Sequence, residues 1–485
     1  MTTSAVQQKR SGLGYWMQDV LIQCEKAAPG FGSEPVHDLR TALRRCRSMA
    51  GGLMVFDPDP AWRRMKRAGR QLFRSLGALR DTHVMAEWID KLAPEDDAAG
   101  HTFKEFLRSL EEKLKATATM ALQEFDSRQW NTWSRELPLR AARIPLDSPI
   151  FAQVALERWH QARVLHRRAL RNRTQVAFHD LRVGIKRFRY TIENFLPRMH
   201  QSWGSDLKHL QDVLGDVHDL DVLWHTAVSL NIFPNPTSRS EWRDHIFQLR
   251  LERLQEYRKK MVGSGSLWQA WRSELPRAED LRSTGLQRLK IWAEFLDPNV
   301  SHSKHVMDLA LQLFDGLSVN GYQEDKRESY RQILQVAALL HDVGHAKVSR
   351  GHHKESARLI RRLQPPSGWT AEELRIASLV ARYHRGALPR ETQKSFSVLP
   401  ESERWLVQFL GGILRLACAC DHKHDRQIHR VQVESSQPIL TVRAEGYAGS
   451  TSLAEHLAAA RHLLEIACQR PVFVVPSDGH PHAAA

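Results

Sequence analysis

Residues 178–190 read FHDLRVGIKRFRY, and a closely similar stretch, VHDLRTALRRCR, occupies residues 36–47. In both copies a histidine is followed by basic residues at the third, seventh, eighth and tenth positions after it. Positions 0, 3, 7 and 10 fall within a narrow arc of a helix with 3.6 residues per turn, so each copy predicts a helix with a cationic stripe. The residues concerned are His37, Arg40, Arg44, Arg45 and Arg47 in the first copy, and His179, Arg182, Lys186, Arg187 and Arg189 in the second.

Neighbouring like charges on one helix face repel each other by a few tenths of a kcal/mol per pair. Such a stripe is therefore expected to face something acidic. A solvated charged face is the alternative for one run of this kind. Duplication of the same spacing favours a binding surface.

A second signature follows each stripe at a similar distance. LGALRDTHV occupies residues 76–84 and LGDVHDLDV occupies residues 214–222. His37 precedes Asp81 by 44 residues and His179 precedes Asp219 by 40, so the repeated unit is a helical hairpin or a larger helical block. The two aspartates are interpreted as partners that anchor helices to arginine rather than as catalytic acids.

The intervening segments also predict helices. Apolar residues recur at threes and fours from residue 61 to residue 92 and predict a single cationic helix that carries Arg70 and Arg74. Residues 101–175 predict three helices, interrupted around Pro138, Pro145 and Pro149.

The composition favours a polyanionic partner. The 485 residues have a formal net charge of +15 and a pI near 9.8. Residues 1–288 hold 46 Lys and Arg against 34 Asp and Glu, whereas the remainder holds 24 against 21. Nucleic acid, polyphosphate and acidic lipid are all partners that such a charge attracts, and the first half of the chain is the half expected to bind them.

The cysteines and the hydropathy indicate a reduced compartment. Five cysteines without paired spacing do not suggest a disulfide framework. No run of 18 apolar residues and no signal-peptide pattern occurs, so neither a membrane span nor secretion is expected. The expected location is cytoplasmic, with association with polyphosphate granules as a further expectation.

Residues 10–282 resemble the CHAD family, on the strength of the two HxxRxxx[KR]RxR helices and the two LGxxxD segments. The resemblance implies a pair of pseudo-symmetric helical bundles around a basic channel that binds inorganic polyphosphate. It also implies that the ten residues of the two stripes are ligands, with Arg70, Arg74 and Lys208 as additional candidates. Arginine and lysine suit a flexible polyanion because every phosphate offers acceptor oxygens on all sides. Nucleic acid is the rival ligand, but the sequence has no recognised reading motif and no interleaved aromatic platform.

Histidine dominates the residues after 288. HSKHV begins at His302, and AALLHDVGH places the adjacent His341 and Asp342 where an apolar helix ends before Gly344. Both side chains can therefore turn to a shared metal ion. Imidazole and carboxylate together bind divalent ions, which activate water for attack on phosphorus.

Residues 288–475 resemble the HD phosphohydrolase superfamily. GHHKESARLI, residues 351–360, and ARYHRG, residues 381–386, are more narrowly similar to the helical C-terminal domain of the exopolyphosphatase/guanosine-pentaphosphatase family. The resemblance implies a divalent metal such as Mn or Mg, with His302, His341 and Asp342 as ligands and an acid from a later helix. That helix ends in ACACD, where Cys418 replaces the usual acid and Asp421 matches the second one. The candidate catalytic residues are His341, Asp342, His345 and His384.

The predicted fold is mainly α: a pseudo-symmetric helical bundle over residues 10–282 and an α-helical HD domain over 288–475. Residues 428–433, 439–444 and 471–475 predict strands around a helix at 451–468, a small β-α-β cap. Residues 476–485 are expected to be a disordered tail.

Two functions follow as hypotheses. In the first, the bundle captures polyphosphate and the HD site hydrolyses it or a phosphorylated nucleotide. In the second, the chain is a non-catalytic polyphosphate receptor whose HD domain has lost its metal.

Overall fold

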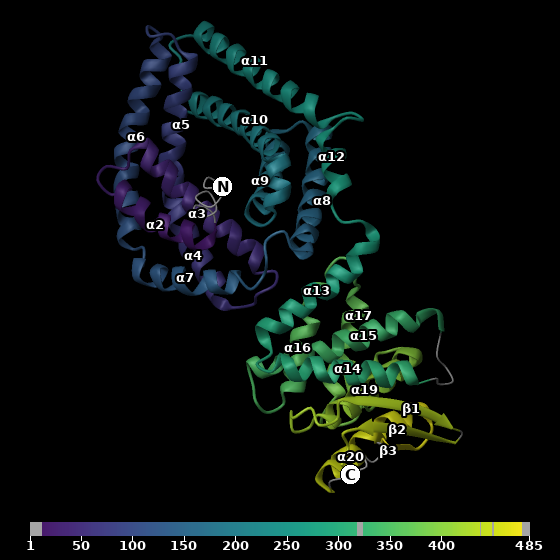
Figure 1. Cartoon of the computed structure of the whole chain (residues 1–485). Helices are drawn as coiled ribbons and strands as arrows, with labels where there is room; N and C mark the ends of the chain where they lie inside the picture. Colours follow the sequence, from purple (N-terminus) through teal and green to yellow (C-terminus); the bar gives the residue numbers. More distant parts are fainter. Residues whose placement is uncertain (1–11, 318–323, 437, 449–450, 478–485) are drawn as a thin grey trace, which may run out of the picture. The chain divides into compact units, whose positions relative to one another are not determined.

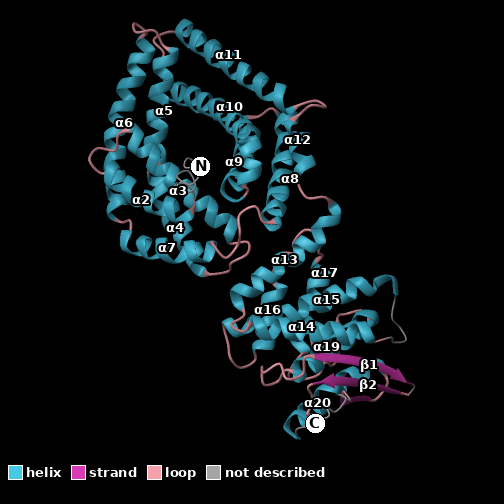
Figure 2. Cartoon of the chain, viewed as in Figure 1, coloured by secondary structure: helices cyan, strands magenta, loops and turns pink. Residues whose placement is uncertain are grey.

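The computed structural model describes residues 12–317, 324–436, 438–448 and 451–477, which are mostly helical (Figure 1; Figure 2). This confirms the predicted mainly α fold class. The chain divides into two compact units, Met1–Arg277 and Ala278–Ala485. Most of the expected disordered tail lies outside the described residues. No helix of the described residues combines the length and the apolar character that crossing a membrane requires.

The first unit contains two sets of helices in the same order. The first set is α2 (Leu13–Ala27), α3 (Ser33–Leu53), α4 (Pro60–Ser75), α5 (Gly77–Leu92), α6 (Ala98–Gln123) and α7 (Ser127–Ala141). The second set is α8 (Pro149–Asn172), α9 (Gln175–Phe195), α10 (Pro197–Ser229), α11 (Pro236–Met261) and α12 (Leu267–Glu274).

Equivalent helices make equivalent contacts in the two sets. The hairpin of α2 with α3 corresponds to that of α8 with α9, and α5 packs on α6 as α10 packs on α11. The two sets meet where α3 contacts α9 and α5 contacts α10 (Figure 1). The two helices with the cationic stripes, α3 and α9, therefore lie side by side at the centre of the unit.

The single helix predicted over residues 61–92 is wrong, because the structure has two helices, α4 and α5, that meet at Leu76. In the second set the same Leu-Gly pair lies inside the continuous helix α10. A Cβ on Gly77 would lie 3.4 Å from Nη1 of Arg40, whereas a Cβ on Gly215 would meet nothing within 4 Å. The break thus occurs where the backbone passes close to a cationic side chain of α3.

The interruption predicted at Pro138 is also wrong, since α7 runs through it. A proline inside a helix removes one backbone hydrogen bond and normally kinks or ends the helix. Here its ring packs beside Gly14 of α2, where an added Cβ would lie only 3.5 Å away. The close packing of α2 on α7 offsets the lost hydrogen bond.

The second unit is a helical layer with a small sheet. Its helices are α13 (Ala278–Leu296), α14 (Val300–Gly316), α15 (Arg327–Leu340), α16 (His352–Arg361), α17 (Ala371–Tyr383), α18 (Lys394–Ser397), α19 (Glu401–Cys420) and α20 (Thr451–Cys468), with short 3₁₀ turns η1 (Glu324–Lys326) and η2 (Val343–Ala346). Helix α19 is apolar along most of its length and packs against α14, α15, α17 and α20. A Cβ on Gly412 would lie 2.6 Å from the backbone nitrogen of Leu464, so this glycine allows α20 to pack closely on α19.

The three strands are β1 (Arg430–Ser436), β2 (Ile439–Glu445) and β3 (Val472–Pro476), in the order β1-β2-β3. β1 and β2 are antiparallel, and Val433 faces Val442. β2 and β3 are parallel and are joined through α20. The predicted β-α-β cap is therefore present.

Candidate functional sites: a basic cavity and a histidine-rich pocket

A cavity of about 850 Å³ lies in the first unit between the two helix sets. Both cationic stripes contribute to its wall, and so do α4, α5, α8 and α10. Its wall contains two aspartates, Asp81 and Asp219, against nine arginines and lysines. The basic residues are Arg40, Arg44, Arg47, Lys66, Arg80, Arg158, Arg182, Lys186 and Arg187, accompanied by His37 and His218. We call this site the basic cavity.

Seven of the thirteen ligand candidates predicted from the sequence line the basic cavity: His37, Arg40, Arg44, Arg47, Arg182, Lys186 and Arg187. Arg45 and Arg189 do not line it, because both pair with the carboxylate of Glu193. The Arg189 Nη2 to Glu193 Oε2 distance is 3.6 Å. A single acidic residue thus holds one arginine from each stripe away from the cavity.

The other four candidates are exposed and do not line the cavity. Arg70 and Arg74 are exposed on α4, close enough for their charges to lower the pKa of Arg47, although burial of Arg47 is the larger cause. His179 packs its ring 4.9 Å from that of His218. Lys208 is exposed on α10.

Four basic or histidine residues of the cavity wall were not among those candidates: Lys66, Arg80, Arg158 and His218. Arg80 and His218 occupy equivalent places in the two LGxxxD segments, directly before Asp81 and Asp219. The internal repeat could therefore have identified this pair. Lys66 and Arg158 belong to cationic helices in which the sequence alone does not distinguish an inward residue from an outward one.

Aromatic rings orient several of the cavity cations. The ring of Phe73 lies 4.1 Å from the guanidinium of Arg40 and 4.8 Å from that of Arg47. Arg40 also donates to the carbonyl oxygen of Phe73 at 2.7 Å. Tyr190 lies 6.0 Å from the guanidinium of Arg44. Such contacts hold long side chains in place before any ligand arrives.

Several of these cations have an unpaired Nε–H group. The Nε–H groups of Arg44, Arg47 and Arg182 are buried and have no hydrogen-bond acceptor among the described residues. A buried donor without an acceptor costs about 1–3 kcal/mol. An anion in the cavity would supply the missing acceptors.

Burial shifts two pKa values in the basic cavity. Burial, reinforced by Arg182 and Arg44, lowers the pKa of Lys186 to about 7. Burial raises the pKa of Asp219 to about 6, against the opposing effect of Arg182. A polyanion in the cavity would favour the protonated form of both side chains, and would therefore restore the positive charge of Lys186.

The second unit contains a pocket of about 310 Å³ rich in histidine. His341 and His384 each directly follow the last residue of a helix, α15 and α17. Each places its Nδ1 2.7 Å from the carbonyl oxygen three residues earlier, Ala338 or Ala381. Donation from Nδ1 fixes each ring and leaves Nε2 as the nitrogen that can accept a hydrogen bond or bind a metal ion. Nε2 of His384 lies 3.4 Å from Nε2 of His352. His341 and His384 are buried, at 0% and 3% exposure.

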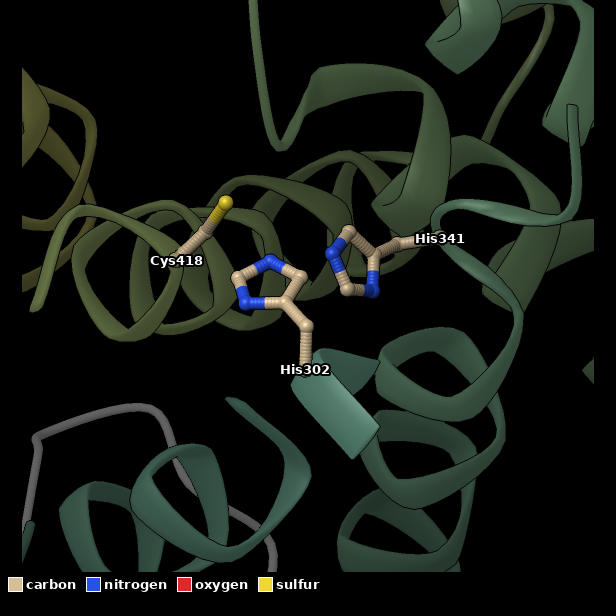
Figure 3. A group of neighbouring side chains, drawn as sticks. All are labelled: His302, His341 and Cys418. Carbon is tan, nitrogen blue, oxygen red and sulfur yellow. The ribbon is translucent and has the colours of Figure 1, made fainter. Parts of the chain in front are cut away.

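Three groups of side chains bring potential metal ligands together. They are His302 with His341 and Cys418 (Figure 3), His341 with Asp342 and His384, and Asp342 with His345 and His352. Within each group, one ligand atom from every residue lies within 4.8 Å of the others.

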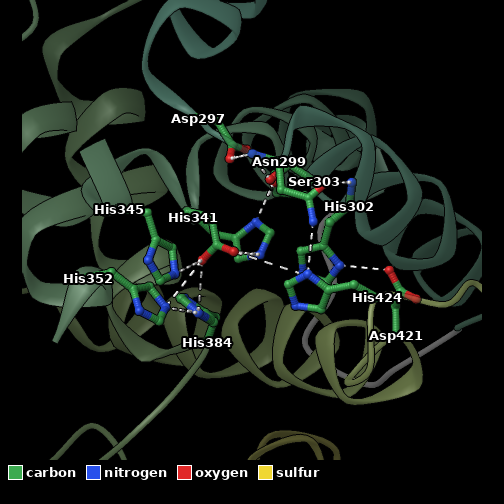
Figure 4. A network of polar contacts seen from close by, with 12 residues as sticks. Asp297, Asn299, His302, Ser303, His341, His345, His352, His384, Asp421 and His424 are labelled. Atoms are coloured by element: carbon green, nitrogen blue, oxygen red, sulfur yellow. Dashed lines mark hydrogen bonds and ion pairs between the residues drawn. The ribbon is translucent and has the colours of Figure 1, made fainter. Parts of the chain in front are cut away.

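Asp342 is the centre of this pocket. Its Oδ1 lies 3.2 Å from Nε2 of His352 and 3.8 Å from Nε2 of His384, and its Oδ2 lies 3.6 Å from Nε2 of His341. Figure 4 shows the rings of His341, His352 and His384 close together. Burial would raise the pKa of Asp342, but the surrounding histidines hold it well below its usual range. The carboxylate is therefore ionised and surrounded by imidazole nitrogens.

His302, on α14, is oriented by Asp421. Its Nδ1 lies 2.7 Å from Oδ2 of Asp421, whose other oxygen accepts the backbone N–H of Arg426 at 2.8 Å. Nε2 of His302 consequently faces Asp342 at 3.9 Å. Asp421, expected as a metal ligand, belongs to none of the three groups and lies behind His302. Cys418 lies at the position where a ligand is expected.

The donor set of this pocket fits a divalent ion. Nε2 of His341 and Oδ1 of Asp342 are buried and make no hydrogen bond within the described part of the chain. Such atoms are costly without a partner, and both imidazole nitrogen and carboxylate oxygen are metal ligands. A bound ion would satisfy both atoms.

Further cationic groups surround the pocket. Arg385, Arg415, His422 and His456 line it. Arg415 is held by the carbonyl oxygens of Tyr383 and Gly386, at 3.3 and 2.8 Å. His456, on α20, stacks on His422 with ring centroids 3.7 Å apart. The sequence offered Arg385 as a possible phosphate ligand or helix cap and His422 as part of a possible zinc cluster with Cys418, Cys420 and His424. It did not identify Arg415 or His456, which come from two separate helices, α19 and α20.

Comparisons with known proteins agree with this division. Residues 18–228 match the model of the CHAD domain, and residues 286–456 match the model of the Ppx/GppA phosphatase, domain III. A crystal structure of the CHAD domain from the plant Ricinus communis matches with 20% identity and a TM-score of 0.37, over 54% of this chain and 88% of that chain. No curated protein matches the chain. The two family models thus confirm both resemblances predicted from the sequence, to a CHAD domain in the first unit and to a domain III of the Ppx/GppA phosphatase type in the second.

Proposed function

We propose that the basic cavity of the first unit binds inorganic polyphosphate. The observation that carries this proposal is the wall of nine arginines and lysines against two aspartates, with three buried Nε–H groups that lack acceptors. A linear chain of phosphoryl groups offers acceptor oxygens on every side, so it can satisfy donors from both helix sets at once. The two domain types support a polyphosphate-related role, and association with polyphosphate granules would follow from it.

Titration with long-chain polyphosphate at several salt concentrations tests this binding. Arg182→Gln should weaken binding by about tenfold or more, because a hydrogen bond to a charged group contributes about 1.5–3 kcal/mol. Lys208→Gln is the matched control, since Lys208 is a predicted ligand that lies outside the cavity wall and should change little. Equal effects of the two substitutions would contradict the proposal. If the protein bound duplex DNA and polyphosphate at equal phosphate concentration could not displace it, the result would favour nucleic acid as the ligand.

We also propose that the second unit is a metal-dependent phosphohydrolase acting on polyphosphate or on a phosphorylated nucleotide. His302, His341, Asp342 and Cys418 would hold the ion, and Asp421 would orient His302. When bound, a divalent ion supplies Lewis-acid activation of water for attack at phosphorus. The buried His341 and His384 keep the interior of the site shielded from bulk solvent.

The remaining residues of the pocket have separate roles in this proposal. Arg385 and Arg415 bind the phosphate oxygens of the substrate, as planar cations do well. The side chain of His345 is 31% exposed and lies 3.9 Å from Oδ1 of Asp342. It is therefore positioned to donate a proton to the phosphate oxygen that leaves.

Metal content and phosphate release from a panel of polyphosphates and nucleotides test the enzyme proposal. His341→Ala should abolish both, whereas His462→Ala, on the outward face of α20 with a side chain 61% exposed, should leave both unchanged. Cys418, in place of the expected acid, is the observation that favours the alternative, a non-catalytic polyphosphate receptor. Tight polyphosphate binding with neither metal nor turnover would establish that alternative.

A further inference from the structure

Cys418 contributes a sulfur atom to the proposed metal centre, whose other potential ligand atoms are nitrogen and oxygen. It lies on α19, and Sγ is within 4.8 Å of ligand nitrogens of His302 and His341 (Figure 3). Cys420, two residues further along the same helix, points elsewhere and packs in the hydrophobic core. The helix thus presents one of its two thiols to the histidines.

The two histidines are held ready for a shared ligand. His341 is 0% exposed, its Nδ1 is bound to a backbone carbonyl, and its buried Nε2 has no hydrogen-bond partner among the described residues. His302 is 3% exposed, and its Nδ1 is bound to Asp421. The carboxylate behind His302 acts as an outer-shell partner that fixes the ring and raises its basicity as a ligand. The orientation of the two histidines alone therefore indicates an ion at the place where they meet Cys418.

Asp342 lies beside the two histidines of this group. Its Oδ2 lies 3.6 Å from Nε2 of His341 and 3.9 Å from Nε2 of His302. Among the groups of potential ligands, Cys418 occurs with His302 and His341, whereas Asp342 occurs with His341 and His384 and with His345 and His352. One sulfur and two nitrogens match the three protein ligands of an open Zn²⁺ site, whose fourth position is left for water or substrate. Mg²⁺, in contrast, prefers octahedral oxygen ligands and keeps several waters.

We propose that Cys418 is a thiolate ligand and that it makes the metal centre of the second unit selective for a borderline ion, Zn²⁺ or Fe²⁺, over Mg²⁺ and Mn²⁺. The inference rests on the proposed metal centre and specifies its metal. Soft thiolate ligands favour zinc and iron, whereas a carboxylate at the same place suits magnesium and manganese. The proton released from the thiol passes to solvent as the ion binds.

The test measures bound metal rather than activity. The full chain is stripped with a chelator and reloaded anaerobically from an equimolar mixture of Zn²⁺, Fe²⁺, Mn²⁺ and Mg²⁺, and the bound ions are quantified by mass spectrometry. Cys418→Asp should lower the ratio of bound Zn²⁺ to bound Mn²⁺ by at least about tenfold, since loss of outer-shell partners alone changes metal affinity by about 10–100-fold. Cys420→Ala, a change of the neighbouring thiol outside the pocket, should leave the ratio unchanged.

A spectroscopic readout identifies the ligand directly. The chain loaded with Co²⁺ should show a sulfur-to-cobalt charge-transfer absorption, which Cys420→Ala keeps and which Cys418→Ser and Cys418→Asp both lose. Circular dichroism of the two Cys418 variants checks that they remain folded, and the serine variant serves if the aspartate variant does not. A wild-type chain that binds metal through His341 but shows neither the absorption nor dependence on Cys418 would overturn this inference alone. A wild-type chain that binds no metal would overturn the proposed metal centre as well.

Discussion

The two cationic stripes have the same spacing, yet each offers different arginines to the basic cavity. The eighth position after the histidine is Arg45 in α3 and Arg187 in α9, and only Arg187 lines the cavity. The tenth position is Arg47 or Arg189, and only Arg47 lines it. Glu193 makes the difference, because it pairs with Arg45 and Arg189 together.

Glu193 has no acidic counterpart in the first copy. The equivalent position, fourteen residues after the histidine, is Gly51, which lines the cavity. A Cβ on Gly51 would lie 3.4 Å from Nζ of Lys66. In the second copy, the residue at this position pairs with two arginines and keeps them out of the cavity wall. In the first copy, the glycine leaves room for Lys66. A duplicated motif conserves spacing, but its neighbours decide which charges are available.

At a second pair of equivalent positions, a basic residue in one copy corresponds to an acidic residue in the other. His83 of α5 lies 3.5 Å from Glu111 of α6, whereas Asp221 of α10 lies 2.7 Å from Arg250 of α11. Both contacts connect the same two helices of their own set. The connection between helices is retained while the acid and the base exchange places, which is consistent with a structural role outside the cavity.

The largest effect is expected when both stripes are changed together. Arg44→Gln combined with Lys186→Gln removes one cavity cation from each copy, at equivalent positions. Polyphosphate affinity should fall by about 100-fold or more, at about 1.5–3 kcal/mol for each hydrogen bond to a charged group. The slope of log affinity against log salt should become less steep by about 1.4, because each neutralised phosphate of a single strand contributes about 0.7 to its magnitude. The single variants Arg44→Gln and Lys186→Gln serve as the comparison. If only one of them lowered polyphosphate affinity, the two copies would not be equivalent in binding.

Acidification should strengthen polyphosphate binding by up to about tenfold between pH 8 and pH 6. The pKa of Lys186 is lowered to about 7 and that of Asp219 is raised to about 6. As the pH falls through this range, Lys186 gains its positive charge and Asp219 begins to lose its negative charge, and both changes favour a polyanion. Isothermal titration across this range should detect proton uptake on binding. Lys186→Arg is the control, because arginine stays protonated, and an unchanged pH dependence in this variant would exclude Lys186 as the cause.

Glu193→Gln should increase polyphosphate affinity severalfold, because it releases Arg45 and Arg189 from their shared carboxylate. The same change should cost about 1 kcal/mol of folding stability, since two partly buried guanidiniums lose a charged acceptor. Binding titration and urea unfolding measure the two effects. Glu112→Gln, which alters an exposed pair with Lys115 on α6, should change neither. Weaker binding in the Glu193 variant would mean that the carboxylate positions the cavity rather than withholding its charge.

The smallest effect on binding is expected at the reversed pair. Asp221→Asn should lower the free energy of unfolding by about 1–3 kcal/mol, because it leaves the guanidinium of Arg250 without its charged acceptor. Polyphosphate affinity should stay within about twofold of the wild-type value, since Asp221 is outside the cavity wall. Thermal unfolding and the binding titration together check this separation. A parallel loss of binding would assign the pair a functional role.

Local periodicity made several features predictable from the sequence. The helical spacing of the stripes, the repeat of the LGxxxD segments and the alternation in residues 428–444 each fix which way side chains leave their own backbone. These signals identified the helical class, the β-α-β cap and seven of the cavity residues. The adjacent His341 and Asp342 likewise identified the centre of the second pocket, because a helix that ends there directs both side chains to one place.

By itself, then, the sequence determined most of the helices, the cationic stripes, the adjacent His341 and Asp342 and the two domain resemblances, because all of these depend on neighbours within a few turns of the chain. Only the tertiary structure decided that Arg45 meets Glu193, which is 148 residues away in the sequence. It also decided between Cys418, in the last turn of α19, and Asp421, which directly follows that helix. Their roles differ because the position of His302, on another helix, presents Nε2 toward the pocket with Cys418 and Nδ1 toward Asp421. Periodicity gives the direction of a side chain, whereas the packing of distant helices determines what it meets.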